Sequence, residues 1–129
     1  MILLDENIIN SQRLLLQSWK IHVRQIGYEF ARKGMKDPEI ISFLHKTGEV
    51  TFFTRDGGLY QKDLCHSKYC IGYLALGQSE VATFIRRLLK HSDFNTKAKR
   101  MGKIISISHL HIRFWELKQE SETLLMWIS

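Results

Sequence analysis

The first third of the chain alternates between apolar runs and apolar residues at helical spacing. Residues 2–4 form a short, continuously apolar run, which is typical of a strand buried on both faces of a sheet. Apolar residues at helical spacing follow over residues 10–19. The alternation over residues 21–26 then predicts a second strand. This part of the chain is therefore expected to form a strand, a helix and a strand.

The same order continues in the middle of the chain. Residues 31–36 are predicted to form a loop, and residues 37–46 carry apolar side chains on one face of a second helix. A strand at residues 50–56 runs into an acidic residue, and residues 70–76 predict a fourth strand. The clearest helical spacing belongs to five apolar residues, namely Val81, Phe84, Ile85, Leu88 and Leu89.

The last part of the chain predicts further β structure. Residues 103–108 and 110–117 have the pattern of two strands with a tight reversal near Ser108, or of one bent strand, and the last dozen residues are expected to form a short terminal helix. Strands that alternate with helices of this length imply a parallel or mostly parallel sheet. We therefore predict a single α/β domain over residues 1–129, with an additional β element at its C-terminal end.

The composition is that of an ordinary globular protein. The chain is 44% hydrophobic and 25% charged, with a single proline and no low-complexity stretch. No apolar run is long enough to cross a bilayer, and the N-terminus lacks a signal-peptide pattern, so we expect a cytoplasmic protein without a membrane partner. In that compartment Cys65 and Cys70 are expected to be free thiols, since the pair lacks the further ligands of a closed zinc site.

Positive charge is concentrated in one segment of the sequence. The formal net charge is +6, and residues 86–103 hold seven basic residues and one acid. Such clustering suits a polyanion-binding surface, because basic side chains that neutralise phosphates release counterions. A solvated helix face followed by a basic loop is the structural alternative.

Acidic residues follow two of the predicted strands. Asp5 and Glu6 come directly after the first strand, and Asp56 ends the strand at residues 50–56. Ligands of an open parallel sheet bind beyond the carboxyl ends of its strands. If the two strands are close neighbours, their carboxylates converge on one edge, where such a group usually holds a hard cation.

Each acid also has a structural interpretation. Asp5 suits the N-cap of the following helix, and Asp37 suits an N-cap position with Pro38 at the first helical position. Asp56 precedes two glycines and fits a turn. The pair His109 and His111 has possible ligand spacing, but without a third ligand nearby ordinary surface histidines are expected.

Three stretches of the sequence resemble the PIN-domain superfamily, in particular a short PIN-like branch of small prokaryotic proteins. They are "ILLDEN" at residues 2–7, "KDPEIISFLHKTGEVTFFTRD" at residues 36–56 and "KIISISHLHIRFWE" at residues 103–116. The resemblance implies a three-layer α/β/α fold and a nuclease that uses Mg²⁺ or Mn²⁺ to hydrolyse single-stranded RNA. Many members of that superfamily are toxins of toxin/antitoxin modules, which are inhibited by a small antitoxin protein, and many are homodimers.

The resemblance also assigns residues to roles. Asp5, Asp37 and Asp56 match the metal-binding acids, and Glu6 joins them as a catalytic residue. A fourth acid of the family site is not placed, with Glu6, Glu29 and Glu39 as the candidates. The residues expected to contact substrate are Asn7, Thr54, Arg55, Arg86, Arg87, Lys97, Lys99 and Arg100.

Two other functions remain open on the sequence. A PIN-like module that binds RNA or protein without turnover is compatible with the missing fourth acid. A phosphoacceptor domain also places acids after the first strand, but it requires a lysine after the fifth strand, and Lys103 precedes that strand instead.

Overall fold

Seven strands form one sheet in the computed structural model, which describes residues 1–29 and 32–127. The spatial order is β2-β1-β3-β4-β5-β6-β7. The first five of these strands run parallel, and β6 and β7 add an antiparallel pair at one side. Their bounds are Ile2–Leu4 (β1), Arg24–Gln25 (β2), Val50–Thr54 (β3), Tyr69–Leu74 (β4), Lys103–Ile107 (β5), His111–Glu116 (β6) and Thr123–Met126 (β7).

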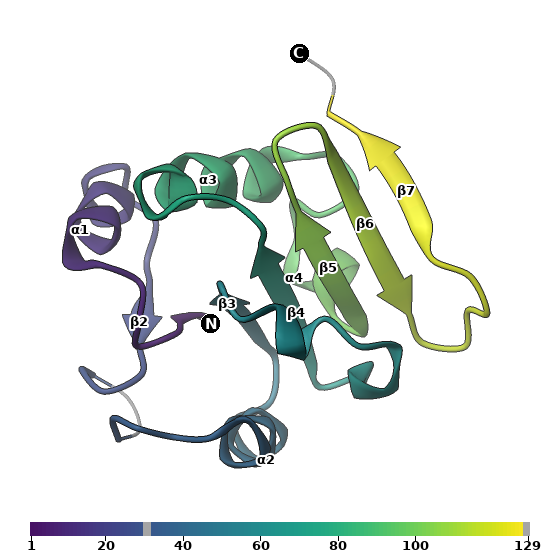
Figure 1. Cartoon of the computed structure of the whole chain (residues 1–129), viewed down its shortest axis with the longest axis horizontal. Coiled ribbons are helices and arrows are strands. Elements are labelled where there is room, and N and C mark those ends of the chain that lie inside the picture. Colours follow the sequence, from purple (N-terminus) through teal and green to yellow (C-terminus); the bar gives the residue numbers. More distant parts are fainter. Residues whose placement is uncertain (30–31, 128–129) are drawn as a thin grey trace.

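Helices cover both faces of this sheet. Helices α1 (Asn10–Ser18) and α3 (Val81–Lys90) lie on one side, and α2 (Asp37–Thr47) lies on the other (Figure 1). A short helix, α4 (Lys97–Arg100), precedes β5. Three 3-10 turns, η1 (Gly57–Leu59), η2 (Lys62–Leu64) and η3 (Gln78–Glu80), complete the helical elements of the described residues. The predicted α/β class with a mostly parallel sheet and a C-terminal β element is confirmed.

Two apolar cores form because neighbouring residues of a strand point to opposite faces. Leu4 of β1 and Phe53 of β3 belong to the core under α1 and α3. Leu3 and Phe52 belong to the core under α2. All four side chains are fully buried, which explains why the first strand reads as an uninterrupted apolar run. Burial on both faces fixes the position and register of each strand. It therefore also fixes the position of the residue that follows the strand.

The structure departs from the expected elements in three places. The second strand is limited to Arg24 and Gln25, and α4 occupies part of the expected basic loop. The predicted terminal helix is wrong, because Thr123–Met126 pair with β6 as an antiparallel strand with alternating half-buried and exposed residues. Pairing with a preceding strand is a long-range effect that the local sequence pattern does not reveal. Residue 31 of the predicted loop and residues 128–129 lie outside the described part.

Two further expectations can be compared with the described residues. Cys65 and Cys70 are free thiols, the second of them buried, as expected. None of the helices in residues 1–29 and 32–127 has the length and hydropathy that crossing a bilayer requires.

Candidate functional site

Asp5 is the residue at which β1 leaves the sheet. Its backbone N–H donates to the carbonyl of Phe53 (2.9 Å), so the chain is still held to β3 at this point. The side chain is buried, and both carboxylate oxygens accept hydrogen bonds. The Thr54 hydroxyl donates to Oδ2 (2.7 Å), and the Glu6 backbone N–H donates to Oδ1 (2.8 Å). The carboxylate therefore has one defined position at the sheet edge.

Thr54 connects two of the predicted acids. It is the last residue of β3 and is fully buried. While its hydroxyl donates to Asp5, its oxygen accepts from the backbone N–H of Asp56 (3.0 Å). One hydroxyl group thus fixes the carboxylate after β1 relative to the turn after β3.

Asp56 begins the 3-10 turn η1. Its Oδ1 accepts from the backbone N–H of Gly58 (2.9 Å), so the predicted turn interpretation is correct for this oxygen. A Cβ at Gly58 would lie 3.1 Å from this Oδ1 and 3.9 Å from Oδ2 of Asp37. The carboxylates of Asp37 and Asp56 therefore approach each other above a residue without a side chain.

Asp37 reaches the site from α2, on the other side of the sheet edge. The helix begins at Asp37, with Lys36 in the cap position and Pro38 inside the first turn. The expected N-cap role of Asp37 is therefore wrong by one position. The exposed N–H of Lys36 is bound instead by the Glu39 carboxylate (3.3 Å). The Asp37 carboxylate remains available to face Asp56.

Burial and mutual repulsion raise the pKa of two of these acids. Burial is the main cause of the raised pKa of Asp5, which persists against the hydrogen bonds from Thr54 and Glu6; repulsion by the Glu6 and Asp56 charges adds to it. The pKa of Asp37 is also raised by burial, by the charge of Asp56, by a hydrogen bond with Asp56 and by the charge of Asp5. The three aspartates therefore interact electrostatically, and their simultaneous ionisation is unfavourable.

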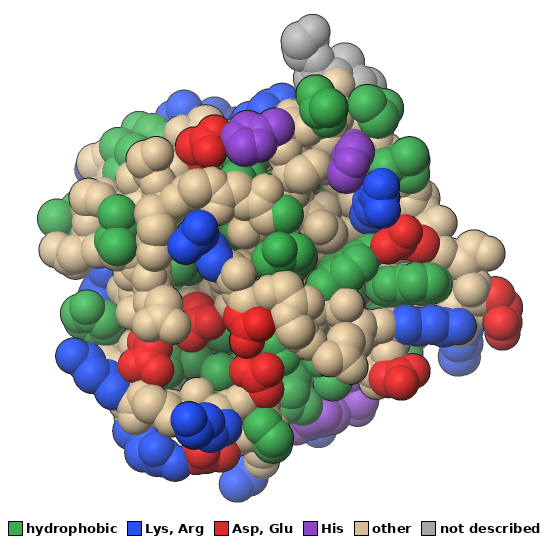
Figure 2. Space-filling model, viewed as in Figure 1, with side chains coloured by type: hydrophobic (Ala, Val, Ile, Leu, Met, Phe, Trp, Pro, Cys, Tyr) green, Lys and Arg blue, Asp and Glu red, His purple; other side chains and the backbone are tan. Residues whose placement is uncertain are grey.

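These residues line a cleft with a volume of about 620 Å³. Figure 2 shows acidic side chains gathered on this face, with Lys and Arg side chains around them. The lining comprises Asp5, Glu6, Asn7, Met35, Lys36, Asp37, Pro38, Ile40, Arg55 and Asp56. The acids, Asn7 and Arg55 predicted from the sequence therefore meet at one place, at the carboxyl edge of β1 and β3.

The candidates for a fourth acid differ in position. Glu6 lines the cleft, although one of its oxygens accepts from the Gly34 backbone N–H (2.9 Å). Glu29 forms an ion pair with Arg13, and Glu39 forms one with Arg32. Of the three, Glu6 is the one that lines the cleft.

The basic residues that were predicted to contact substrate lie in several separate parts of the structure. Lys97 pairs with Glu49, which immediately precedes β3 (3.3 Å), and the buried Arg100 donates to Thr51 near the start of β3 (2.9 Å). Lys99 lies on the same short helix α4. These three residues are at the amino edge of the sheet, opposite the acids.

Arg86 and Arg87 lie on α3, away from the residues that line the cleft. The guanidinium of Arg86 stacks over Trp19, 3.7 Å from the ring centroid. Arg87 stacks over Trp127 at 4.3 Å. The cleft itself is rimmed by Arg55, whose Nε donates to the carbonyl of Leu76 (3.0 Å), and by Lys36, which sequence reasoning missed.

Gln25 is a second residue that sequence reasoning missed. Its side chain is fully buried, and Nε2 donates to the carbonyls of Asp5 (3.0 Å) and Ile8 (2.7 Å). Within the described residues its Oε1 has no hydrogen-bond partner. Gln25 thus holds the segment that carries Asp5 and Glu6. The only signal in the sequence was a polar residue where the strand alternation expects an inward-facing side chain.

The donor chemistry of the cleft fits a hard divalent cation. Carboxylate and amide oxygens are ligands that suit Mg²⁺ and Mn²⁺, and the cleft offers both through its acids and Asn7, while the residues lining it in the described part include neither His nor Cys. The arrangement is not a finished metal site, however. Across residues 1–29 and 32–127, no three His, Cys, Asp or Glu side chains are close enough together to hold an ion.

Comparisons with known proteins identified no relative of this chain. No family model matches the chain, and neither the curated proteins nor the solved structures contain a significant match.

Proposed function

We propose that this protein is a metal-dependent endoribonuclease that hydrolyses single-stranded RNA and uses Mg²⁺ or Mn²⁺. The proposal depends on one observation, the convergence of Asp5, Asp37 and Asp56 in an open cleft at the carboxyl edge of the sheet. The raised pKa values of Asp5 and Asp37 support it, because a bound cation would offset the repulsion that raises them. The resemblance to PIN domains points to the same residues.

Different residues of the chain would perform different parts of such a reaction. Asp5 and Asp56 present carboxylate oxygens whose positions are set by Thr54 and Gly58, and Asp37 approaches from α2. Arg55 and Lys36 on the rim would attract and orient a phosphodiester. When bound, the metal supplies Lewis-acid activation of the phosphate and of a water molecule.

We further propose that the protein acts as the toxin of a toxin/antitoxin module, with a small protein as its inhibitor. This step depends on the PIN resemblance. A homodimer is also proposed, since the last strand of the sheet exposes Leu124 and Met126 to solvent.

A catalytically inactive RNA- or protein-binding module is the second candidate. It is favoured by the absence, among the described residues, of three acids already close enough to hold an ion. In that case RNA would bind equally with Mn²⁺ and with EDTA, and no divalent metal would support cleavage.

The test compares Asp5→Asn with Asp63→Asn, which removes the same charge from an exposed residue of η2 outside the cleft. The measurements are cleavage of a labelled single-stranded RNA with Mn²⁺ and the melting temperature with and without Mn²⁺. Metal assistance contributes several kcal/mol to such reactions, so Asp5→Asn should slow cleavage by roughly a hundredfold or more. It should also reduce the stabilisation by Mn²⁺. Equal cleavage by the two variants would show that Asp5 is not part of the active site.

A further inference from the structure

Two segments without acidic residues pack against each other on one face of the sheet. Residues 7–28, which include α1, and residues 81–92, which include α3, contain no Asp or Glu. Helices α1 and α3 are in contact and lie side by side in Figure 1. We call these two segments the acid-free layer. Its six basic residues are Arg13, Lys20, Arg24, Arg86, Arg87 and Lys90. Arg24 differs from the other five, because it lies on β2 in register with Leu3 and therefore faces the α2 side of the sheet.

The acid-free layer accounts for the whole net charge of +6. The remaining residues of the chain hold thirteen basic and thirteen acidic side chains and are therefore neutral overall. The sequence had located the surplus at residues 86–103, but in space two of the four basic residues in the second half of that segment lie beside acids. Lys97 pairs with Glu49, and Lys103 lies 3.8 Å from Glu116. Five of the layer's six basic residues lie on or beside α1 and α3, and of these five only Arg13 is paired with an acid in the described part of the chain.

Most of the layer's charges are unpaired. Arg13 forms an ion pair with Glu29, whereas the other five basic residues form none with any residue in the described part of the chain. Two of these five, Arg86 and Arg87, stack on Trp19 and Trp127. Stacking holds a guanidinium in a fixed plane and leaves N–H groups at its edges for an anionic ligand.

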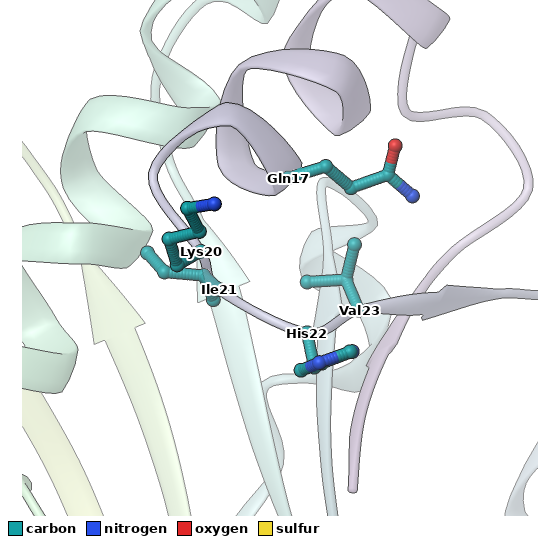
Figure 3. A pocket seen from close by; sticks show the side chains of 5 residues that line it. All are labelled: Gln17, Lys20, Ile21, His22 and Val23. Carbon is teal, nitrogen blue, oxygen red and sulfur yellow. The ribbon is translucent and has the colours of Figure 1, made fainter.

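A pocket opens in the same layer, where α1 ends and the chain turns toward β2 (Figure 3). It has a volume of about 310 Å³ and is lined by Gln17, Lys20, Ile21, His22 and Val23. This volume is at the lower end of the range for ligand pockets. The lining combines apolar side chains with Lys20 and His22, which suits a nucleotide, because the aromatic face of its base is apolar and its phosphate is anionic.

We propose that the acid-free layer, including this pocket, is a second binding site for single-stranded RNA, separate from the acidic cleft. A positively charged surface interleaved with aromatic rings is the usual means of binding a single strand without sequence preference. The inference extends the proposed function, because the ligand is the same RNA, but binding at this site requires no metal.

The position of the layer allows one strand to reach both sites. Helix α1 begins shortly after the cleft residues Asp5, Glu6 and Asn7, and its nine residues span about 14 Å before the pocket. The turn η3, which leads into α3, lies beside the cleft residue Asn7, since Gln78 of η3 donates to the Asn7 carbonyl (2.8 Å). Both helices therefore lead from the cleft along the basic surface.

The test uses two triple variants that each lower the net charge from +6 to +3. One removes charges on the α1 and α3 side of the layer, through Lys20→Gln, Arg86→Gln and Lys90→Gln. The control removes exposed charges elsewhere, through Lys46→Gln, Lys68→Gln and Lys118→Gln. Affinity for a labelled single-stranded RNA is measured by fluorescence anisotropy in EDTA over a series of salt concentrations. Unchanged melting temperatures establish that both variants are folded.

Each phosphate contact contributes about 0.7 to the slope of log affinity against log salt for a single strand. The layer variant should therefore lose about two units of slope and bind roughly a hundredfold more weakly at about 0.1 M salt. The control should stay within about threefold of the parent protein. Equal weakening of both variants, no RNA binding by the parent protein, or loss of binding only to anionic lipid vesicles would each overturn the proposal.

The two proposals fail in different ways. Asp5→Asn should bind RNA in EDTA at least as tightly as the parent protein, because the layer is intact and one repelling carboxylate is removed from the cleft. If no protein cleaves RNA but the layer variant still loses affinity selectively, the nuclease function is wrong and the second binding site is retained. If cleavage depends on Asp5 and the layer variant binds RNA normally, the opposite conclusion holds.

Discussion

The hydroxyl of Thr54 offers the most specific test of the site's geometry, because it forms hydrogen bonds with both Asp5 and Asp56. The substitution Thr54→Val preserves the shape of a fully buried side chain but removes its one oxygen. Asp5 then loses the donor to Oδ2 (2.7 Å), and the Asp56 N–H loses its acceptor (3.0 Å). A buried hydrogen bond to a charged group contributes about 1.5 to 3 kcal/mol, and one between neutral groups about 0.5 to 1.5 kcal/mol. We therefore expect Thr54→Val to lower the free energy of unfolding by about 2 to 4 kcal/mol.

Urea denaturation followed by circular dichroism measures this loss. With a slope of about 1 to 3 kcal/mol per molar urea, the midpoint should fall by roughly 0.7 to 4 M. Thr54→Ser is the matched control, because it keeps the hydroxyl and removes a methyl group worth about 1 kcal/mol. In the Asp5→Asn background the loss from Thr54→Val should be smaller by about 1 kcal/mol, since the acceptor is no longer charged.

Two outcomes would refute this reasoning. One is a Thr54→Val variant that is no less stable than Thr54→Ser, which would show that losing the hydroxyl costs no more than losing a methyl group. The other is additivity of Thr54→Val and Asp5→Asn, which would show that the two side chains are not coupled in solution.

Two further predictions concern the same edge of the sheet. Because the folded-state pKa values of Asp5 and Asp37 are raised above 3.8, the folded protein binds more protons than the unfolded chain. Without metal, the free energy of unfolding should therefore fall as pH rises from 3.8 through the raised pKa values. Saturating Mn²⁺ should reduce that loss at neutral pH. Urea titrations at several pH values measure the slope, and a stability that rises across this window would contradict the assignment. The variant Gln25→Leu removes both Nε2 donors and leaves the carbonyls of Asp5 and Ile8 without them, so the free energy of unfolding should fall by about 2 to 3 kcal/mol. Amide hydrogen exchange should show weaker protection at residues 5–9 in particular, whereas uniform weakening over the whole sheet would indicate only a packing defect.

Periodicity predicted the parts of the fold that depend on local sequence. The strands at β1, β3, β4, β5 and β6 and the three longer helices follow from apolar spacing, because each buries a face whose period is visible within a few residues. The convergence of Asp5 and Asp56 was predicted on the condition that their strands are close neighbours, and the pairing of β1 with β3 fulfils that condition. Both steps used only the order of residues and a general property of parallel sheets.

Tertiary packing decided what periodicity could not predict. Gln25 looks like one polar residue in an alternating segment, and only the fold shows that it is buried against the Asp5 carbonyl. The proximity of Asp37 to Asp56 depends on how α2 docks under the sheet. In the same way, the basic residues of α3 and α4 are adjacent in sequence but separate in space, because α3 packs on α1 while Lys97 reaches Glu49.

The separation of charge has a consequence for how RNA and metal would act together. Without a cation, the carboxylates of Asp5, Asp37 and Asp56 repel one another, and they would also repel a phosphodiester that approached the cleft. The acid-free layer attracts the same strand whether or not metal is present. If both proposals hold, the layer determines how tightly RNA binds and the cation determines whether a phosphate enters the cleft. Metal should then change the cleavage rate by far more than it changes RNA affinity, whereas a single site serving both purposes would make the two change together.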